Sequence, residues 1–182
     1  KWRWAAATRP SKQEMHIALL RGIKPGLREY ALYLPLYNGT ESLAVGVPAG
    51  AKFEGLAPHK AKPLIFYGTS ITHGACASRP GIAHPAILGR WFDMPVINIG
   101  FSGNGKMHKE VGELMTEVDA AAYIIDCLPN MNGTMVTERC VPLVKQLRKA
   151  RPNTPIVLVE DRRFPNSWLV PEKSKFHDDN HA

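Results

Sequence analysis

The stretch IFYGTSITHG, residues 65–74, passes from apolar residues straight into glycine, threonine and serine. Its apolar part is short and unbroken, which is typical of a strand buried on both faces of a parallel sheet. No polar spacer separates this strand from Ser70. Because ligands bind at the carboxyl ends of strands in open α/β sheets, the stretch predicts an α/β fold with a serine at its functional edge.

The rest of the second half repeats this pattern of short apolar runs. They are followed or separated by segments of helical periodicity, of which the clearest is 134–150. Alternation of strand and helix predicts right-handed crossovers and a parallel sheet with helices on both faces. The further runs are 96–99 (VINI), 121–128 (AAYIIDCL) and 156–159 (IVLV).

The first third of the chain has a different pattern. Residues 28–47 alternate apolar and polar positions around Asn38-Gly39, which predicts an antiparallel hairpin. We interpret residues 1–58 as the C-terminal part of an N-terminal β domain, sandwich-like, and 59–63 as a linker between prolines. One hairpin is too little for an independent sandwich, so we expect it to pack on the α/β domain or to end a larger module.

Composition narrows the classes of function. The formal charge is +7 over 182 residues, but the basic residues are scattered without an aromatic platform, so we expect no nucleic-acid partner. No apolar run approaches the roughly 20 residues that cross a bilayer, so we expect no membrane partner. The N-terminus lacks the apolar core of a signal peptide and looks truncated, so the cell compartment is not readable.

Polar residues follow three of the predicted strands. Ser70 follows the first, a glycine-rich loop at 100–105 follows the second, and Asn130 follows the third. A serine hydroxyl can act as a nucleophile in acyl transfer, provided that a base takes its proton and fixed donors stabilise the oxyanion. The backbone N–H groups of Ser70 and Gly103 and the side-chain amide of Asn130 would supply those donors.

The motifs YGTSITHG, NIGFSGNG and DCLPN resemble the first three sequence blocks of the SGNH hydrolases, the GDSL-type esterases and lipases. The resemblance covers roughly residues 63–165 and implies that Ser70 is the nucleophile and that Gly103 and Asn130 complete the oxyanion hole. Gly-Thr-Ser in place of Gly-Asp-Ser resembles a subgroup with an N-terminal β domain. The resemblance to the family also implies a flavodoxin-like three-layer α/β/α domain, here residues 64–182, and ester hydrolysis without metal or organic cofactor.

The substrate class stays open at this point. The N-terminal β domain favours a small-molecule or carbohydrate ester, such as an acetylated sugar. The alternative is a catalytically inactive carbohydrate-binding remnant of the same fold. Nucleotide binding is less favoured: residues 100–106 match G-x-x-x-x-G-K, but Met107 stands where a phosphate-binding loop needs Ser or Thr.

Simpler interpretations exist for each site residue. Ser70 alone would be a helix N-cap, Gly103 a loop glycine and Asn130 a turn residue. We expect Asp126 to be a structural hydrogen-bonding partner and His73 to line the pocket. Arg79 either meets a polar substrate or faces solvent. Cys76 and Cys127 either form a disulfide at the sheet edge or remain two buried thiols.

The catalytic base is the missing part. The family's fourth signature is D-x-x-H, and Asp178 and His181 match it literally at the end of the sequence. A terminal histidine would be poorly held, and the preceding residues read as the start of a helix. We therefore expect this chain to be truncated before its last strand and helix and to lack the catalytic Asp-His pair.

Overall fold

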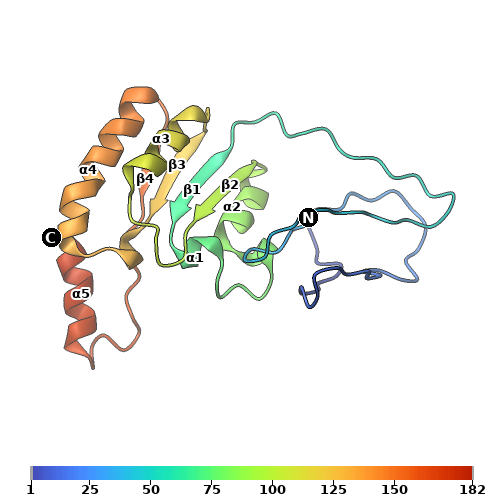
Figure 1. Cartoon of the computed structure of the whole chain (residues 1–182), viewed down its shortest axis with the longest axis horizontal. Helices are drawn as coiled ribbons and strands as arrows, with labels where there is room; N and C mark the ends of the chain where they lie inside the picture. Colours follow the sequence, from blue (N-terminus) through green and yellow to red (C-terminus); the bar gives the residue numbers. More distant parts are fainter. Residues whose placement is uncertain (1, 182) are drawn as a thin grey trace.

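The computed structural model describes residues 2–181, and their side chains except at positions 176, 177, 180 and 181. Its four strands form one parallel sheet in the order β2-β1-β3-β4 (Figure 1). The central strand β1 pairs with β2 on one side and β3 on the other, so three strand ends meet at one edge. The strands are β1 (Leu64–Gly68), β2 (Val96–Gly100), β3 (Ala122–Asp126) and β4 (Ile156–Leu158).

Helices cover both faces of this sheet (Figure 1). Ile65 and Tyr67 of β1 point to the face that α3 and α4 cover, where they share a buried cluster with Met115 and Leu147. Phe66 points to the opposite face and meets the ring of His84 on α2. The helices are α1 (Ser70–His73), α2 (His84–Phe92), α3 (Lys109–Glu117), α4 (Gly133–Ala150) and α5 (Pro171–His181), with 3₁₀ turns at Pro80–Ile82 and Leu128–Asn130.

The predicted α/β architecture is confirmed in its strands, its parallel order and its layers. Each predicted apolar run became a strand within two residues of its expected ends, and β4, Ile156–Leu158, ends one residue early. Helix α4 begins one residue before the predicted range, because the Asn132 side chain accepts a hydrogen bond from the backbone N–H of Met135 at 2.9 Å.

The predicted hairpin over residues 28–47 is wrong. Across residues 2–62, which the structure describes, the chain forms neither helix nor strand. Residues 36–38 bend where the Asn-Gly turn was expected, but no ladder forms on either side. The physical reason is that an isolated pair of strands is marginal in water unless a third strand or a packed face supports it. Here most of the apolar side chains of that segment are exposed.

None of the helices in the described part of the chain is both long enough and apolar enough to cross a membrane.

Candidate active site

The edge where β1 and β2 end is packed backbone against backbone. Gly68 ends β1 and Gly100 ends β2, as register partners. A Cβ placed on Gly100 would collide with the backbone nitrogen of His73, and one on Gly105 with the carbonyl of Gly68. The absence of side chains therefore brings helix α1 and the loop after β2 directly onto the ends of the strands.

Ser70 is the first residue of α1, and it does not cap that helix. Thr69 is the N-cap, and its side-chain oxygen accepts a hydrogen bond from the N–H of Ile71 at 3.2 Å. The cap interpretation of Ser70 is therefore wrong. The Ser70 side chain is half-buried, and its hydroxyl has no hydrogen-bond partner among the described residues. The hydroxyl is consequently available for chemistry rather than committed to holding the helix.

The three predicted segments meet at Phe101. The N–H of Phe101 donates to the carbonyl of Gly68 at 2.9 Å, joining the loop after β2 to the end of β1. The side-chain amide of Asn130 donates to the carbonyl of Phe101 at 3.4 Å, a long contact that joins the third segment. Gly103 lies two residues further along, exposed and with φ of +70°, a conformation that favours glycine.

The floor of this edge is formed by buried groups under the loop. The Tyr67 ring meets Phe101 edge to face at 6.1 Å between centroids, and its hydroxyl accepts from the N–H of His108 at 3.0 Å. Burial raises the pKa of Tyr67 to about 12, so it stays neutral at physiological pH. Tyr67 therefore holds the loop by a neutral hydrogen bond.

Asp126 fixes α1 from below. Thr72 Oγ1, in the same helix as Ser70, donates to Asp126 Oδ2 at 2.8 Å, and both groups are buried. The expected structural role of Asp126 as a hydrogen-bonding partner is thus confirmed. Burial raises the pKa of Asp126, while the Thr72 hydroxyl and the nearby His84 oppose that rise.

Two further groups approach Asp126, and the sequence did not single them out for this. His84 Nε2 lies 3.9 Å from Asp126 Oδ2, and burial lowers the pKa of this imidazole although the Asp126 charge opposes the shift. Asp161 follows β4, with its side chain buried, and one of its oxygens meets Arg162 Nη1 at 2.6 Å. The other oxygen, Oδ2, has no partner among the described residues.

No histidine with a described side chain hydrogen-bonds to Ser70. The His73 ring contacts Leu36 and Tyr37 of the N-terminal segment, and the expectation that His73 lines the pocket stays a prediction. Asp178 lies in α5 and accepts from Ser174 Oγ at 3.5 Å, and the side chain of His181 lies outside the described part. The literal D-x-x-H match is therefore neither supported nor removed.

The cysteines do not pair. Cys76 is exposed and Cys127 is buried, and both are free thiols, so the disulfide alternative and the expectation of two buried thiols are each wrong. Burial raises the pKa of Cys127 to about 12, which keeps it a neutral thiol. Within the described residues, no group of three or more His, Cys, Asp and Glu side chains gathers as metal ligands.

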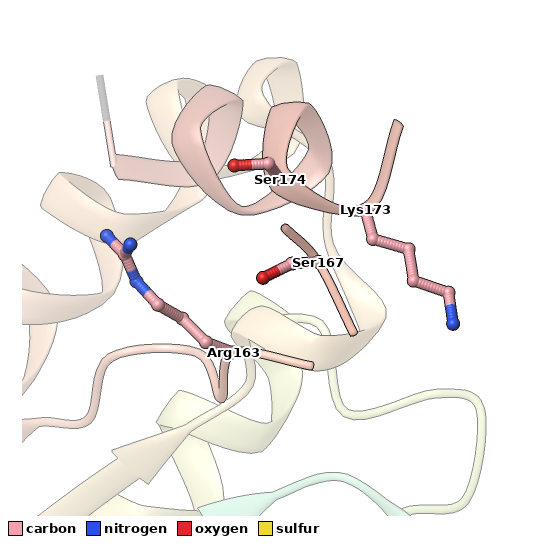
Figure 2. Close-up of a pocket in the computed structure, with 4 residues that line it drawn as sticks. All are labelled: Arg163, Ser167, Lys173 and Ser174. Atoms are coloured by element: carbon pink, nitrogen blue, oxygen red, sulfur yellow. The ribbon is translucent and has the colours of Figure 1, made fainter. Parts of the chain in front are cut away.

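Two surface hollows away from this edge do not contain Ser70, Gly103 or Asn130. Figure 2 shows a small one between the segment after β4 and the first turn of α5, where the hydroxyls of Ser167 and Ser174 face away from the Lys173 side chain. Lys173 Nζ instead reaches Asn166 Oδ1 at 3.1 Å. A broader groove between α3 and α4 starts at Met107 and His108, directly after the glycine loop.

Comparison with known proteins agrees with this arrangement. Residues 61–182 match the model of the GDSL-like lipase/acylhydrolase family, and residues 1–53 match a model for the N-terminus of SGNH-hydrolase-type esterases. A solved protein from Bacteroides ovatus ATCC 8483, described as a GDSL-like lipase, is 39% identical with a TM-score of 0.63. The match covers 66% of this chain and 36% of that one.

A second solved structure is more distant. The salicylyl-acyltransferase SsfX3 of a tetracycline biosynthetic pathway is 24% identical with a TM-score of 0.51, over 59% of this chain and 32% of that one. This likeness shows the fold alone. The chain spans about a third of the length of these two proteins. None of the curated proteins compared matches the chain.

Proposed function

The chain belongs to the GDSL-like lipase/acylhydrolase family, and we propose that it carries the nucleophile and the oxyanion hole of a serine-dependent carboxylic ester hydrolase. The observation that carries this proposal is the half-buried Ser70, whose hydroxyl has no partner among the described residues and which begins the helix at the end of the central strand. A hydroxyl without a structural hydrogen bond can attack an ester once a base takes its proton.

In the proposed reaction, Ser70 Oγ attacks the carbonyl carbon of an ester. A new C–O bond forms, the serine proton passes to a base, and the carbonyl oxygen becomes an oxyanion. The backbone N–H groups of Ser70 and Gly103 and the amide of Asn130 donate to that oxyanion. The bond to the alkoxy oxygen then breaks, and the base returns the proton to the leaving alcohol. Water attacks the acyl-enzyme in the same way and releases the carboxylic acid.

The long 3.4 Å contact between Asn130 and Phe101 suits this role. An amide committed to a short, well-aligned structural bond would have to break that bond to meet a substrate. A long contact costs little to exchange, since hydrogen bonds weaken as the distance grows. Catalytic donors are often loosely engaged before substrate arrives.

The base is proposed to come from outside the part of the chain that the structure describes. No described histidine hydrogen-bonds to Ser70, and four of them make other contacts, with Leu36, Asp126, Asp93 and Glu14. The side chain of His181 is itself outside that part, so Asp178 and His181 stay a candidate pair. His181→Ala in a form extended to the length of the relatives, called the extended form below, tests this pair.

Residues 1–53 match the model for the N-terminus of SGNH-hydrolase-type esterases, which supports an ester substrate, and a carbohydrate ester is the class that we propose. The second candidate function is carbohydrate binding without turnover. The observation that favours it is that no described histidine side chain hydrogen-bonds to the Ser70 hydroxyl. Hydrolysis of p-nitrophenyl acetate by the extended form separates the two: an inert protein that binds oligosaccharide would support binding alone.

The nucleophile is tested with a fluorophosphonate probe on the extended form. We expect the probe to label Ser70, and Ser70→Ala to lose both labelling and nearly all hydrolysis while the protein stays folded. Ser78→Ala is the matched control, because Ser78 is an exposed serine of the following loop. Labelling that persists in Ser70→Ala would refute the assignment.

A further inference from the structure

Helix α1 is a single turn, so its last residue controls its first. The N–H of His73 donates to the carbonyl of Thr69 at 2.9 Å, and the N–H of Gly74 donates to the carbonyl of Ser70 at 2.9 Å. These two bonds tie the backbone on either side of Ser70 to the end of the turn. A displacement of His73 therefore displaces Ser70 as well.

The body of the hydrolase domain holds this turn at Thr72. Its hydroxyl donates to Asp126, and its carbonyl accepts from the side-chain amide of Asn98 at 2.9 Å. Neither contact involves the side chain of His73. The ring of His73 extends in the other direction, toward residues that lie more than thirty positions earlier in the sequence.

The contacts of His73 come from the N-terminal segment. Its Nε2 hydrogen-bonds to the carbonyl of Leu36, which can only accept, so Nε2 carries the hydrogen. The ring also stacks on Tyr37, with centroids 4.1 Å apart and planes 7° from parallel. Leu36 packs so closely that a Cβ on Gly74 would lie 2.6 Å from its Cδ1. His73 is therefore held by two consecutive residues of that segment.

A second set of contacts anchors the same segment on α2 and the loop before it. Arg90 Nη1 donates to the hydroxyl of Tyr33 at 2.7 Å. The guanidinium of Arg79 lies 4.4 Å from the ring centroid of Trp4, and the Trp4 and Tyr33 rings are 6.4 Å apart. Arg79, for which substrate contact and solvent exposure were both open, thus covers an aromatic ring. We call residues 33–37 the strap, since they lie across the end of α1.

We propose that the strap positions the nucleophile through His73, so that His73 and Tyr37 are positioning residues for Ser70. This inference rests on the proposed role of Ser70 as nucleophile. The strap contributes nothing to the buried cluster between the sheet and helices α3 and α4. Its loss should therefore leave the core intact while the turn that carries Ser70 loses one of its holds. Because misplacement of a reacting group by about 1 Å can cost a factor of about 10² in rate, even a small shift would be measurable.

The experiment measures the rate of fluorophosphonate labelling at Ser70, together with kcat and KM for p-nitrophenyl acetate, in the extended form. We expect His73→Ala and Tyr37→Ala each to slow labelling and to lower kcat by about tenfold, within the range for misplaced reacting groups, with KM little changed. The His73→Ala/Tyr37→Ala double variant should be no slower than the slower single variant, because the two residues act through one contact. Tyr37→Phe keeps the stack and should recover most of the rate lost in Tyr37→Ala.

Tyr30→Ala is the matched control, because Tyr30 is an exposed tyrosine of the same segment outside the strap. We expect it to label at the wild-type rate. If His73→Ala does not fold, Tyr37→Ala still tests the proposal. Tyr37 is 53% exposed, so its truncation should leave the protein folded. Wild-type rates in Tyr37→Ala would overturn the positioning role, as would a lower melting temperature with unchanged kcat per folded molecule. Failure of the proposed function itself looks different, since the wild-type protein would then not label at Ser70.

Discussion

The N-terminal segment, residues 2–62, and the α/β domain that follows it both contain apolar runs of strand-like composition, yet only the second forms strands. Ile65, Phe66 and Tyr67 of β1 are buried between two partner strands and two layers of helices. Leu32, Leu34 and Val45 of the first segment are exposed. The comparison shows that an apolar pattern becomes a strand only where neighbours satisfy its backbone and cover its side chains.

The comparison predicts its largest effect on the free energy of unfolding, for one large-to-small side-chain substitution in each region. Ile125 of β3 is fully buried, with 0% exposure, whereas Leu43 is 58% exposed. Ile125→Ala should lower the free energy of unfolding by about 2–5 kcal/mol, through lost burial and the cavity left behind. Leu43→Ala should change it by no more than about 0.5 kcal/mol.

Urea unfolding of both variants and of the wild-type chain measures the two changes in the free energy of unfolding. Equal losses would show that the N-terminal segment is packed as firmly as the sheet and would break the comparison.

The sequence predicted the α/β domain well because its signals are local and redundant. Buried parallel strands read as β-branched runs, helices read as 3.6-residue periodicity, and strand ends carried the polar residues. The hairpin was mispredicted because the alternation around Asn38-Gly39 shows only that one face of the segment is apolar. The pattern does not show whether a partner covers that face.

Only some of the contacts around the candidate site could be predicted from the sequence. The gathering of segments after the strands follows from parallel topology alone, so Ser70 and Asn130 could be placed at one edge. The approach of His84 to Asp126 depends on how α2 docks, and the contact of His73 with Leu36 depends on a segment without regular structure. Neither contact is marked by a pattern in the sequence. The exposed Cys76 was misjudged for the same reason.

A smaller effect is expected where a single buried hydrogen bond is removed from the domain. Thr72→Val deletes the hydroxyl that donates to Asp126 at 2.8 Å and leaves a buried carboxyl oxygen with one donor fewer. The free energy of unfolding should fall by about 1–3 kcal/mol. Thr40→Val is the counterpart in the N-terminal segment, where the side chain is exposed and the change should be near zero.

Chemical denaturation of the two threonine variants gives this difference directly. Similar curves for both would mean that the Thr72 hydroxyl is satisfied equally well by water and that α1 is looser than described.

The contact between the two regions predicts a still smaller loss. Tyr33→Phe removes the hydroxyl that accepts from Arg90, a half-buried hydrogen bond, and should cost about 0.5–1.5 kcal/mol. Tyr30→Phe, in an exposed tyrosine nearby, should cost nothing measurable.

Limited proteolysis sharpens this test, since cleavage within residues 2–62 reports local release of the segment. Faster cleavage in Tyr33→Phe than in Tyr30→Phe is the expected result. Equal cleavage would indicate that Arg90 does not hold the segment.

The smallest effect is expected from titration of His84 in the α/β domain. Burial lowers the pKa of His84 from its ordinary value of 6.5, with Asp126 opposing, so the folded protein binds this proton less readily than the unfolded chain. Its contribution to stability is therefore present above that ordinary value and is lost as the pH falls through it toward the lowered folded pKa. Asp126 has the opposite sign: its raised pKa gives a contribution that is present at low pH and lost as the pH rises through the folded pKa.

Comparing wild type with His84→Gln isolates the first contribution, because Asp126 is common to both proteins. Between pH 8 and pH 5, the melting temperature of the wild type should fall relative to that of His84→Gln. The difference should stay small, because the His84 side chain is 39% exposed and water screens its charge. Thr40→Val changes an exposed side chain of the N-terminal segment that does not titrate, so it should run parallel to wild type. Parallel curves for His84→Gln as well would mean that folding does not change the proton affinity of His84, and the domain and the segment would then not differ in this respect.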